Sequence, residues 1–314
     1  MIPLRSPRDA LSPTALALGS FDGLHQGHRR VIAAIAGDPV PGLVPTVVSF
    51  WPHPRELLHG EPRLRLDLPT EKLALLEPCG IHQLVLVPFT HELAALTPEA
   101  FVEQVLVGQL DARDVAVGEN FRFGVGRSGG SDDLQTIGRR HGLRVHVLPM
   151  LWDGKERVSS SRIRRALAAG KISEATRLLE RPYRFSGPVV RGRGLGRGLG
   201  WPTANLQVDG RKFLPAEGVY AAWARLLPHG STGCAWMSAV MNLGRQPTVD
   251  PLAASAVEVH LLDRELDLEA RELEVEPVAL LRQQRRFDNL EALSAQINAD
   301  AQQARQLLRL QPAG

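Results

Sequence analysis

Cysteine is scarce in this chain of 314 residues, where only Cys79 and Cys234 occur, far apart in the sequence. Two distant cysteines form neither a disulfide framework nor a zinc motif, and they favour a reduced, cytoplasmic setting. No run approaches the roughly 20 apolar residues of a membrane span, and the first residues lack the apolar core of a signal peptide. We therefore expect a cytoplasmic protein without membrane attachment.

An excess of charge of one sign is also missing. The 37 basic and 34 acidic residues leave a formal net charge of +3, and the basic residues are spread along the chain, so no nucleic-acid-binding patch is indicated. Hydrophobic residues make up 44% and charged residues 23%, as in globular proteins. We expect two domains, in a monomer or a weakly self-associating oligomer. The slight basic excess suits a protein that handles anionic small molecules but does not require one.

The first half of the chain alternates short apolar runs with helical patterns. Strands are predicted at residues 14–20, 45–50, 83–89, 114–118 and 144–149, and helices at stretches such as 71–80 and 98–110. The strand runs are apolar on both faces, which is typical of a parallel sheet covered on two sides. This pattern predicts an α/β fold whose ligands bind beyond the carboxyl ends of the strands.

The second half has little helix between its strand-like runs. Strands are predicted at residues 183–190, 218–227, 234–243, 256–262 and 272–281, which indicates a small antiparallel barrel. A terminal helix follows, with Asp288 and Glu291 at capping-box spacing and an apolar stripe of Leu290, Leu293, Ile297, Leu307 and Leu308. We predict domains at residues 1–182 and 183–314.

The segment GSFDGLHQGH (residues 19–28) follows the first predicted strand and opens a helix from about Gly27 to Ala36. Gly23 and Gly27 let the backbone approach a ligand closely, and a helix N-terminus attracts phosphates. His25 and His28 are three residues apart, so they can point to one side of the helix. They could be surface residues or zinc ligands, but no third ligand accompanies them at metal spacing, and their position favours phosphate binding.

These ten residues resemble the HxGH-type signature of the nucleotidyltransferase superfamily, in the form found in bacterial FAD synthetase modules. The segment VSSSRIR (residues 158–164) is similar to the superfamily's SSTxIR signature, with Ser161 in place of threonine. The resemblance implies a Rossmann-like fold in which His25, His28 and Arg162 are catalytic. It also implies that ATP and its phosphates are bound by Gly19, Phe21, Asp22, Gly23, Gly27, Ser159, Ser160, Ser161 and Arg164.

Two further segments resemble the flavin branch of that superfamily. FWPHP (residues 50–54) is similar to its FxPHP loop, and GENFRFGVGRSG (residues 118–129) to its GxxFRFGxxRxG loop; in isolation either could be structural. The resemblance implies flavin contacts from Phe50, Pro52, His53, Asn120, Phe121 and Arg122. The implied reaction is attack of the FMN phosphate on the α-phosphorus of ATP, with Mg²⁺, to give FAD and pyrophosphate without a covalent intermediate.

A glycine-rich run precedes the sequence PTAN (residues 202–205). The glycines alone could form a flexible linker, and neither a Walker A loop nor a GxGxxG motif can be fitted. However, residues 194–205 resemble the glycine-rich approach and PTAN signature of riboflavin kinases. The resemblance implies that Gly194, Gly196 and Gly200 bind ATP phosphates. Thr203 and Asn205, which face one side of an extended chain, would bind ATP and ligate Mg²⁺.

Residues 257–263 (VEVHLLD) resemble the strand that carries the catalytic base of riboflavin kinases. The resemblance implies that Glu258 accepts the proton of the riboflavin ribityl hydroxyl, although a strand carboxylate is more often a solvated residue. Similarity of LRQQRRF (residues 281–287) to the family's LRxExxF segment implies that Arg282 contacts flavin or phosphate.

Several residues in this half depart from the riboflavin kinase pattern. Residues 263–270 lose an aromatic residue and a glycine, residues 239–241 differ from the usual sequence, and Gln284 replaces a glutamate. The favoured interpretation is a bifunctional enzyme that makes FMN from riboflavin and FAD from FMN. The alternative is an FMN adenylyltransferase whose kinase half binds flavin but is weak or inactive. A non-catalytic sensor is disfavoured, because both histidines, PTAN and Glu258 are present.

Overall fold

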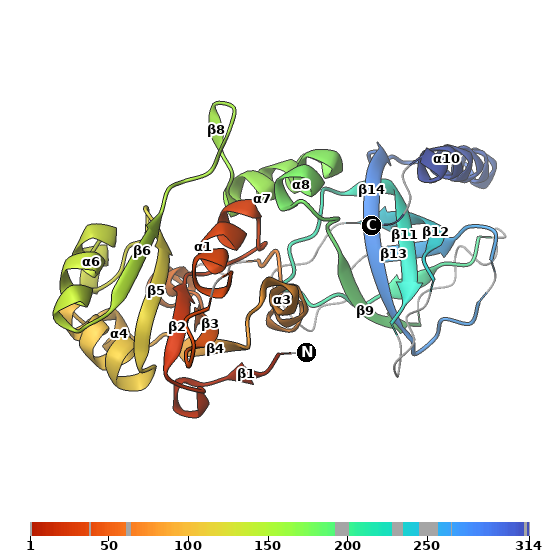
Figure 1. Cartoon of the computed structure of the whole chain (residues 1–314). Helices are drawn as coiled ribbons and strands as arrows, with labels where there is room; N and C mark the ends of the chain where they lie inside the picture. Colours follow the sequence, from red (N-terminus) through yellow and green to blue (C-terminus); the bar gives the residue numbers. More distant parts are fainter. Residues whose placement is uncertain are drawn as a thin grey trace. The chain divides into compact units, whose positions relative to one another are not determined.

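The computed structural model describes residues 2–37, 39–60, 64–191, 201–227, 235–244, 257–264, 266–310 and 313. The chain forms two compact units, Met1–Ser160 and Ser161–Gly314, which appear in Figure 1 in red to green and in green to blue.

The first unit contains a six-stranded parallel sheet in the order β1-β4-β3-β2-β5-β6. Its strands are β1 (Leu4–Arg5), β2 (Thr14–Leu18), β3 (Val44–Trp51), β4 (Gln83–Pro88), β5 (Ala112–Gly118) and β6 (Arg144–Leu148). The parallel α/β prediction is confirmed, and all five predicted strands are present. The edge strand β1 was not predicted, because two residues are too few to show a periodic pattern.

Helices cover both faces of this sheet (Figure 1). The α-helices are α1 (Gln26–Ala36), α2 (Pro54–His59), α3 (Pro69–Leu76), α4 (His91–Ala94), α5 (Pro98–Phe101) and α6 (Ser131–Arg140). The predicted helix at residues 98–110 begins as α5 and continues as a π-helix, η3 (Val102–Gln109). A small hairpin, β7 (Trp152–Asp153) and β8 (Glu156–Arg157), follows the sheet.

This unit has two hydrophobic cores, one on each face of the sheet, and successive residues of a strand contribute to them in turn. On β2, Leu16 and Leu18 pack against α5, η3 and α6, whereas Ala15 and Ala17 pack against α1 and α3. Successive side chains of a strand point to opposite faces, so a continuous apolar run fills both cores. The small alanines let α1 lie close to β2, the strand that ends at the first sequence motif.

The second unit contains α7 (Ser160–Ala168), which begins at the last residue of the first unit, α8 (Ile172–Leu179) and a closed antiparallel barrel in the order β10-β13-β12-β11-β14-β9. The strands are β9 (Phe185–Val190), β10 (Ala204–Leu206), β11 (Gly218–Leu226), β12 (Met237–Leu243), β13 (Val257–Leu261) and β14 (Glu272–Arg282). The predicted barrel is confirmed. Closure pairs each of the six described barrel strands on both sides, so none of these strands is an edge strand.

The terminal helix α10 (Leu290–Leu310) packs on the outside of the barrel, along β11, β12 and β14 (Figure 1). Ala301, Ala304 and Leu308 form its buried stripe. The predicted capping box of Asp288 and Glu291 is wrong. The helix begins one residue later than that spacing requires, and Asn289 Oδ1 accepts a hydrogen bond from the backbone N–H of Ala292 at 2.8 Å. Asparagine is as good an N-cap as aspartate, so composition did not distinguish the two positions.

Gly187 on β9 gives a stability prediction for the barrel. A Cβ at this position would collide with the carbonyl oxygen of Gln207 and lie 2.8 Å from its carbonyl carbon. Backbone atoms cannot move aside as a flexible side chain can, so Gly187→Ala should lower the free energy of unfolding of the barrel by about 1–3 kcal/mol. Urea unfolding measures this. Ser186→Ala is the matched control, and an equal unfolding midpoint for the two variants would contradict the expected clash.

Candidate active sites

The motifs of the first unit all lie at the carboxyl end of its sheet. Residues 19–25 connect β2 to α1, Pro52 and His53 connect β3 to α2, and residues 119–129 follow β5. Strands β3 and β4 lie on one side of β2, and β5 and β6 on the other. The crevice at such a switch point is where open α/β sheets bind their ligands.

His25 and His28 lie together at the start of α1. His25 is the N-cap residue, and its Nδ1 accepts a hydrogen bond from the backbone N–H of His28 at 3.4 Å. The two rings are stacked, with 3.6 Å between centroids and 19° between planes. The rings of Phe21 and His28 form a T-shaped contact, with 5.4 Å between their centroids. The expectation that both histidines point to one side is confirmed.

Burial keeps both imidazoles neutral. It lowers the pKa of His25 to about 4, with a further lowering by the charge of Arg29. Burial, followed by the charges of His25 and Lys72, holds the pKa of His28 well below its ordinary value. A neutral imidazole whose Nδ1 accepts a hydrogen bond carries its proton on Nε2, so His25 presents an N–H donor at neutral pH. The Nδ1 atom of His28 is buried and has no hydrogen-bond partner within the described residues.

The loop before the histidines is held from several sides. Asp22 Oδ1 accepts hydrogen bonds from the backbone N–H groups of Leu66 at 2.9 Å and Asp67 at 3.3 Å. The Ser160 hydroxyl donates to the backbone carbonyl of Asp22 at 2.8 Å. This bond joins the second sequence signature to the first, although the two lie at opposite ends of the α/β region.

Lys72 on α3 is a buried cation that the sequence did not single out. Its Nζ donates to the backbone carbonyl of Ser20 at 2.7 Å. Burial lowers the pKa of Lys72, while the charges of Asp22 and Asp67 raise it. In sequence it belongs to an ordinary amphipathic helix (residues 71–80), so only the tertiary structure shows that it supports the motif loop.

Aromatic rings gather where the flavin-branch loops meet. The ring centroid of Phe50, at the end of β3, lies 6.3 Å from that of Phe101, and the centroid of Phe101 lies 5.5 Å from that of Phe123. The ring of Phe121 is stacked on that of Phe123, with 5.6 Å between centroids. The structure therefore brings two of the predicted flavin residues, Phe50 and Phe121, into one cluster. Phe101 and Phe123 were not predicted; Phe123 stood within the recognised FRFG segment, whereas Phe101 had no sequence signal.

Other predicted residues of this half have local contacts. His53 caps α2, where its Nδ1 accepts from the backbone N–H of Arg55 at 3.2 Å. Arg162 is buried in the second unit, where its Nη2 lies 3.2 Å from Glu174 Oε1. The flavin role of His53 and the catalytic role of Arg162 remain predictions, as do the roles given to Gly19, Gly23, Gly27, Pro52, Asn120, Arg122, Ser159, Ser161 and Arg164.

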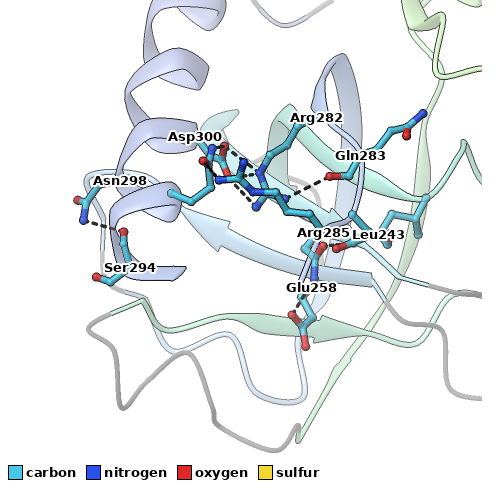
Figure 2. Close-up of polar contacts among 11 residues, drawn as sticks. Leu243, Glu258, Arg282, Gln283, Arg285, Ser294, Asn298 and Asp300 are labelled. Carbon is cyan, nitrogen blue, oxygen red and sulfur yellow. Dashed lines mark hydrogen bonds and ion pairs between the residues drawn. The ribbon is translucent and has the colours of Figure 1, made fainter. Parts of the chain in front are cut away.

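A polar row crosses three neighbouring strands of the barrel. Glu258 on β13 pairs in register with Asn205 on β10 and with Asn242 on β12. Directly opposite residues point to the same face of a sheet, so the three side chains share one face, while Val257 and Val259 point into the barrel. The Oε2 atom of Glu258, which is labelled in Figure 2, accepts from Asn242 Nδ2 at 3.2 Å.

Thr203 lies two residues before Asn205 and thus on the same side of an extended chain. Threonine and asparagine oxygens are hard donors that suit Mg²⁺, which keeps several waters and takes few ligands from the protein. These two residues, with the carboxylate of Glu258 opposite Asn205, fit a magnesium-bound phosphate. The predicted phosphate-binding Gly194, Gly196 and Gly200 lie outside the described residues.

Arg282 at the end of β14 forms an ion pair with the buried Asp300 of α10 (Figure 2). Its Nε and Nη2 atoms both lie 2.9 Å from Asp300 Oδ2, and Asp300 Oδ1 also accepts from Gln296 at 2.7 Å. The pair therefore connects the barrel to its terminal helix. The predicted contact of Arg282 with flavin or phosphate remains a prediction.

The low pKa of His25 predicts acid sensitivity of the first unit. The ordinary histidine value is 6.5 and the folded value about 4, so between these pH values the unfolded state binds more protons. The free energy of unfolding should therefore fall by up to about 3 kcal/mol as the pH drops from 6.5 to 4. His25→Asn, which keeps an N-cap acceptor, should flatten this dependence in thermal unfolding; an unchanged slope would contradict it.

Fold and sites together indicate a two-domain transferase. An α/β unit with two stacked histidines at a helix N-terminus is followed by a barrel that carries a carboxylate in register with two asparagines. Comparison with known families agrees with this division. Residues 8–162 match the FAD synthetase family model, and residues 179–308 match the riboflavin kinase model.

Proteins from several bacteria match nearly the whole chain. The bifunctional riboflavin kinase/FMN adenylyltransferase of Escherichia coli K12 is 37% identical, over 94% of this chain and 93% of its own. The protein of the same name from Pseudomonas fluorescens is 39% identical, over 92% and 91%. The chain belongs to the bifunctional riboflavin kinase/FMN adenylyltransferase family. Its activities are phosphorylation of riboflavin to FMN and adenylylation of FMN to FAD, and riboflavin, FMN and ATP are the substrates.

A solved structure from Streptococcus pneumoniae, described as a macrolide-efflux protein, has a similar fold. It matches with a TM-score of 0.81 and 28% identity, over 97% of this chain and 98% of the other. Among the described residues of the present chain, no helix combines the length and apolar character needed to cross a membrane.

Proposed function

We propose that the two activities use separate sets of residues, with adenylylation at the carboxyl end of the parallel sheet and phosphorylation on the polar row of the barrel. The stacking of two neutral histidines on the N-terminus of α1 carries the first assignment. The register of Asn205, Glu258 and Asn242 carries the second. The proposal keeps functional domains at residues 1–182 and 183–314, in a cytoplasmic monomer or weakly self-associating oligomer.

In the adenylylation reaction, a phosphate oxygen of FMN attacks the α-phosphorus of ATP. The new phosphorus–oxygen bond forms as the bond to the β-phosphate breaks, and pyrophosphate leaves. His25 and His28 donate hydrogen bonds to phosphate oxygens whose charge grows in the transition state, which is where fixed donors lower the barrier most. Ser160 and Arg162 add to the anion site, and Mg²⁺ would neutralise part of the phosphate charge. The glycines and hydroxyls of both signatures would hold the triphosphate.

The flavin of this reaction would lie against Phe50 and Phe121, the partly buried members of the aromatic cluster, while Phe101 and Phe123 pack behind them in the core. Aromatic side chains bind planar ring systems by offset or edge contacts. Asn120 and Arg122, on the loop after β5, would provide polar contacts, together with Pro52 and His53 after β3.

In the phosphorylation reaction, the ribityl hydroxyl of riboflavin attacks the γ-phosphorus of ATP, and ADP leaves. The Glu258 carboxylate accepts the proton of the attacking hydroxyl. Thr203 and Asn205 would hold the Mg²⁺ that neutralises the phosphates, and Gly194, Gly196 and Gly200 would contact the phosphates themselves. Arg282 would contact flavin or phosphate.

Separate assays of the two half-reactions test this proposal. Pure protein is given riboflavin, ATP and Mg²⁺ in one reaction, and FMN, ATP and Mg²⁺ in another, and products are separated by chromatography. We expect FMN from the first and FAD from the second, and neither once the metal is chelated. A single substitution in either site that abolished both activities would contradict the assignment to separate residues.

A further inference from the structure

Asn242 lies between Glu258 and Gln284, a residue that has no role in the proposed kinase site. Its Nδ2 donates to Glu258 Oε2 at 3.2 Å, and its Oδ1 accepts from Gln284 Nε2 at 2.5 Å. Gln284 Nε2 also donates to the backbone carbonyl of Leu243 at 3.1 Å. The segment after β14 is thereby linked to β12 and, through Asn242, to β13; Figure 2 shows Leu243 and Glu258 in this group.

The direction of these hydrogen bonds follows from chemistry. An ionised carboxylate can only accept, so Asn242 must present its NH₂ group to Glu258. The carbonyl oxygen of Asn242 then needs a donor from the opposite side. The carboxamide of Gln284 supplies that donor, and one NH₂ group can serve both Asn242 and Leu243.

Gln284 stands where the riboflavin kinase pattern has a glutamate. An ionised glutamate offers acceptors only, so it could not donate to Asn242 Oδ1 or to the carbonyl of Leu243. The amide at this position is therefore what the observed direction of the hydrogen bonds requires in this chain.

We propose that Asn242 and Gln284 are positioning residues for the riboflavin kinase reaction. Gln284 fixes the amide of Asn242, and Asn242 holds the Glu258 carboxylate in one orientation on the face that it shares with Asn205. The inference rests on the proposed function of Glu258 as the base. In that step the ribityl oxygen bonds to the γ-phosphorus, the bond to the bridging oxygen of ADP breaks, and the ribityl proton moves to Glu258.

The exposed position of Gln284 allows an effect on catalysis to be distinguished from an effect on the stability of the fold. Its side chain is exposed, so removing it opens no cavity, and Gln284→Ala should unfold at nearly the same temperature as the unchanged protein. The adjacent Gln283 is exposed too, and it accepts a hydrogen bond from Arg282 through its backbone carbonyl, which an alanine keeps. Gln283→Ala is thus a matched control.

The test measures kcat and KM of both half-reactions in the full chain for Gln284→Ala, Asn242→Ala, the double variant and Gln283→Ala. We expect Gln284→Ala to lower the kinase kcat about three- to tenfold, as for the loss of one hydrogen bond. The KM for ATP, the FMN adenylylation rate and the Gln283→Ala variant should be unaffected. Because Gln284 acts through Asn242, the double variant should be no slower than Asn242→Ala.

An unchanged kinase kcat in Gln284→Ala would overturn the inference, and so would losses that multiply in the double variant. Glu258→Gln, measured in the same assays, distinguishes failure of the base assignment from failure of the positioning role. If it retains kinase activity, the assignment of the base fails and the inference with it. If it is inactive while Gln284→Ala is fully active, the base assignment stands and only the positioning role is wrong.

Discussion

Replacing His28 by alanine should lower the rate of FMN adenylylation about 10²–10³-fold and leave riboflavin phosphorylation unchanged. Removing one fixed donor to a charge that develops in the transition state costs about this much. His28 is neutral, stacked on His25, and placed at the N-terminus of α1, where phosphates are attracted. The loss should fall mainly on kcat, because the hydrogen bond strengthens as phosphate charge grows.

The measurement is steady-state formation of FAD from FMN and ATP, with the kinase reaction assayed on the same preparation. His82→Ala is the matched control, since His82 is exposed and precedes β4 at the opposite end of the sheet. Unfolding temperatures of the three proteins show whether the fold is kept. A folded His28→Ala protein with normal FAD formation would remove His28 from the mechanism.

Replacing Glu258 by glutamine should lower riboflavin phosphorylation about 10²–10⁴-fold, which is the usual contribution of a general base. Glutamine preserves the size of the side chain but cannot take the proton of the ribityl hydroxyl. FMN adenylylation should continue, because the residues proposed for it lie in the α/β half and in the SSSRIR segment. The substitution should leave the packing of the barrel core unchanged, because Glu258 is on the outer face of the barrel and Val257 and Val259 fill its interior.

Kinase activity is measured by conversion of riboflavin to FMN at saturating ATP. Glu272→Gln on β14 is a suitable control, because that carboxylate is exposed on a strand of the same barrel. Equal losses in the two variants would point to a general effect on the barrel. A Glu258→Gln protein that phosphorylates riboflavin at the normal rate would exclude Glu258 as the base.

The sequence by itself determined the two architectures and most of their strands. Continuous apolar runs such as residues 14–18 predict buried parallel strands because each face needs its own core. Alternation of apolar and polar residues at positions 257–261 predicts a half-buried barrel strand, because only one face of such a strand packs against a core. The motif residues were also recognisable, because each motif is a contiguous segment of one loop or one helix start and resembles a family signature.

Contacts between distant segments were decided only by the tertiary structure. Lys72 lies beside Ser20, Ser160 donates to Asp22, and Gln284 reaches Asn242. Each of these bonds depends on how strands are ordered and in what register they pair, and a local sequence pattern carries no information about its partner in another element. Asn289 replaced the expected cap for a related reason, since several adjacent polar residues can cap a helix and packing of the helix selects one. The sequence thus identified the chemical groups, and strand order and register determined which groups meet.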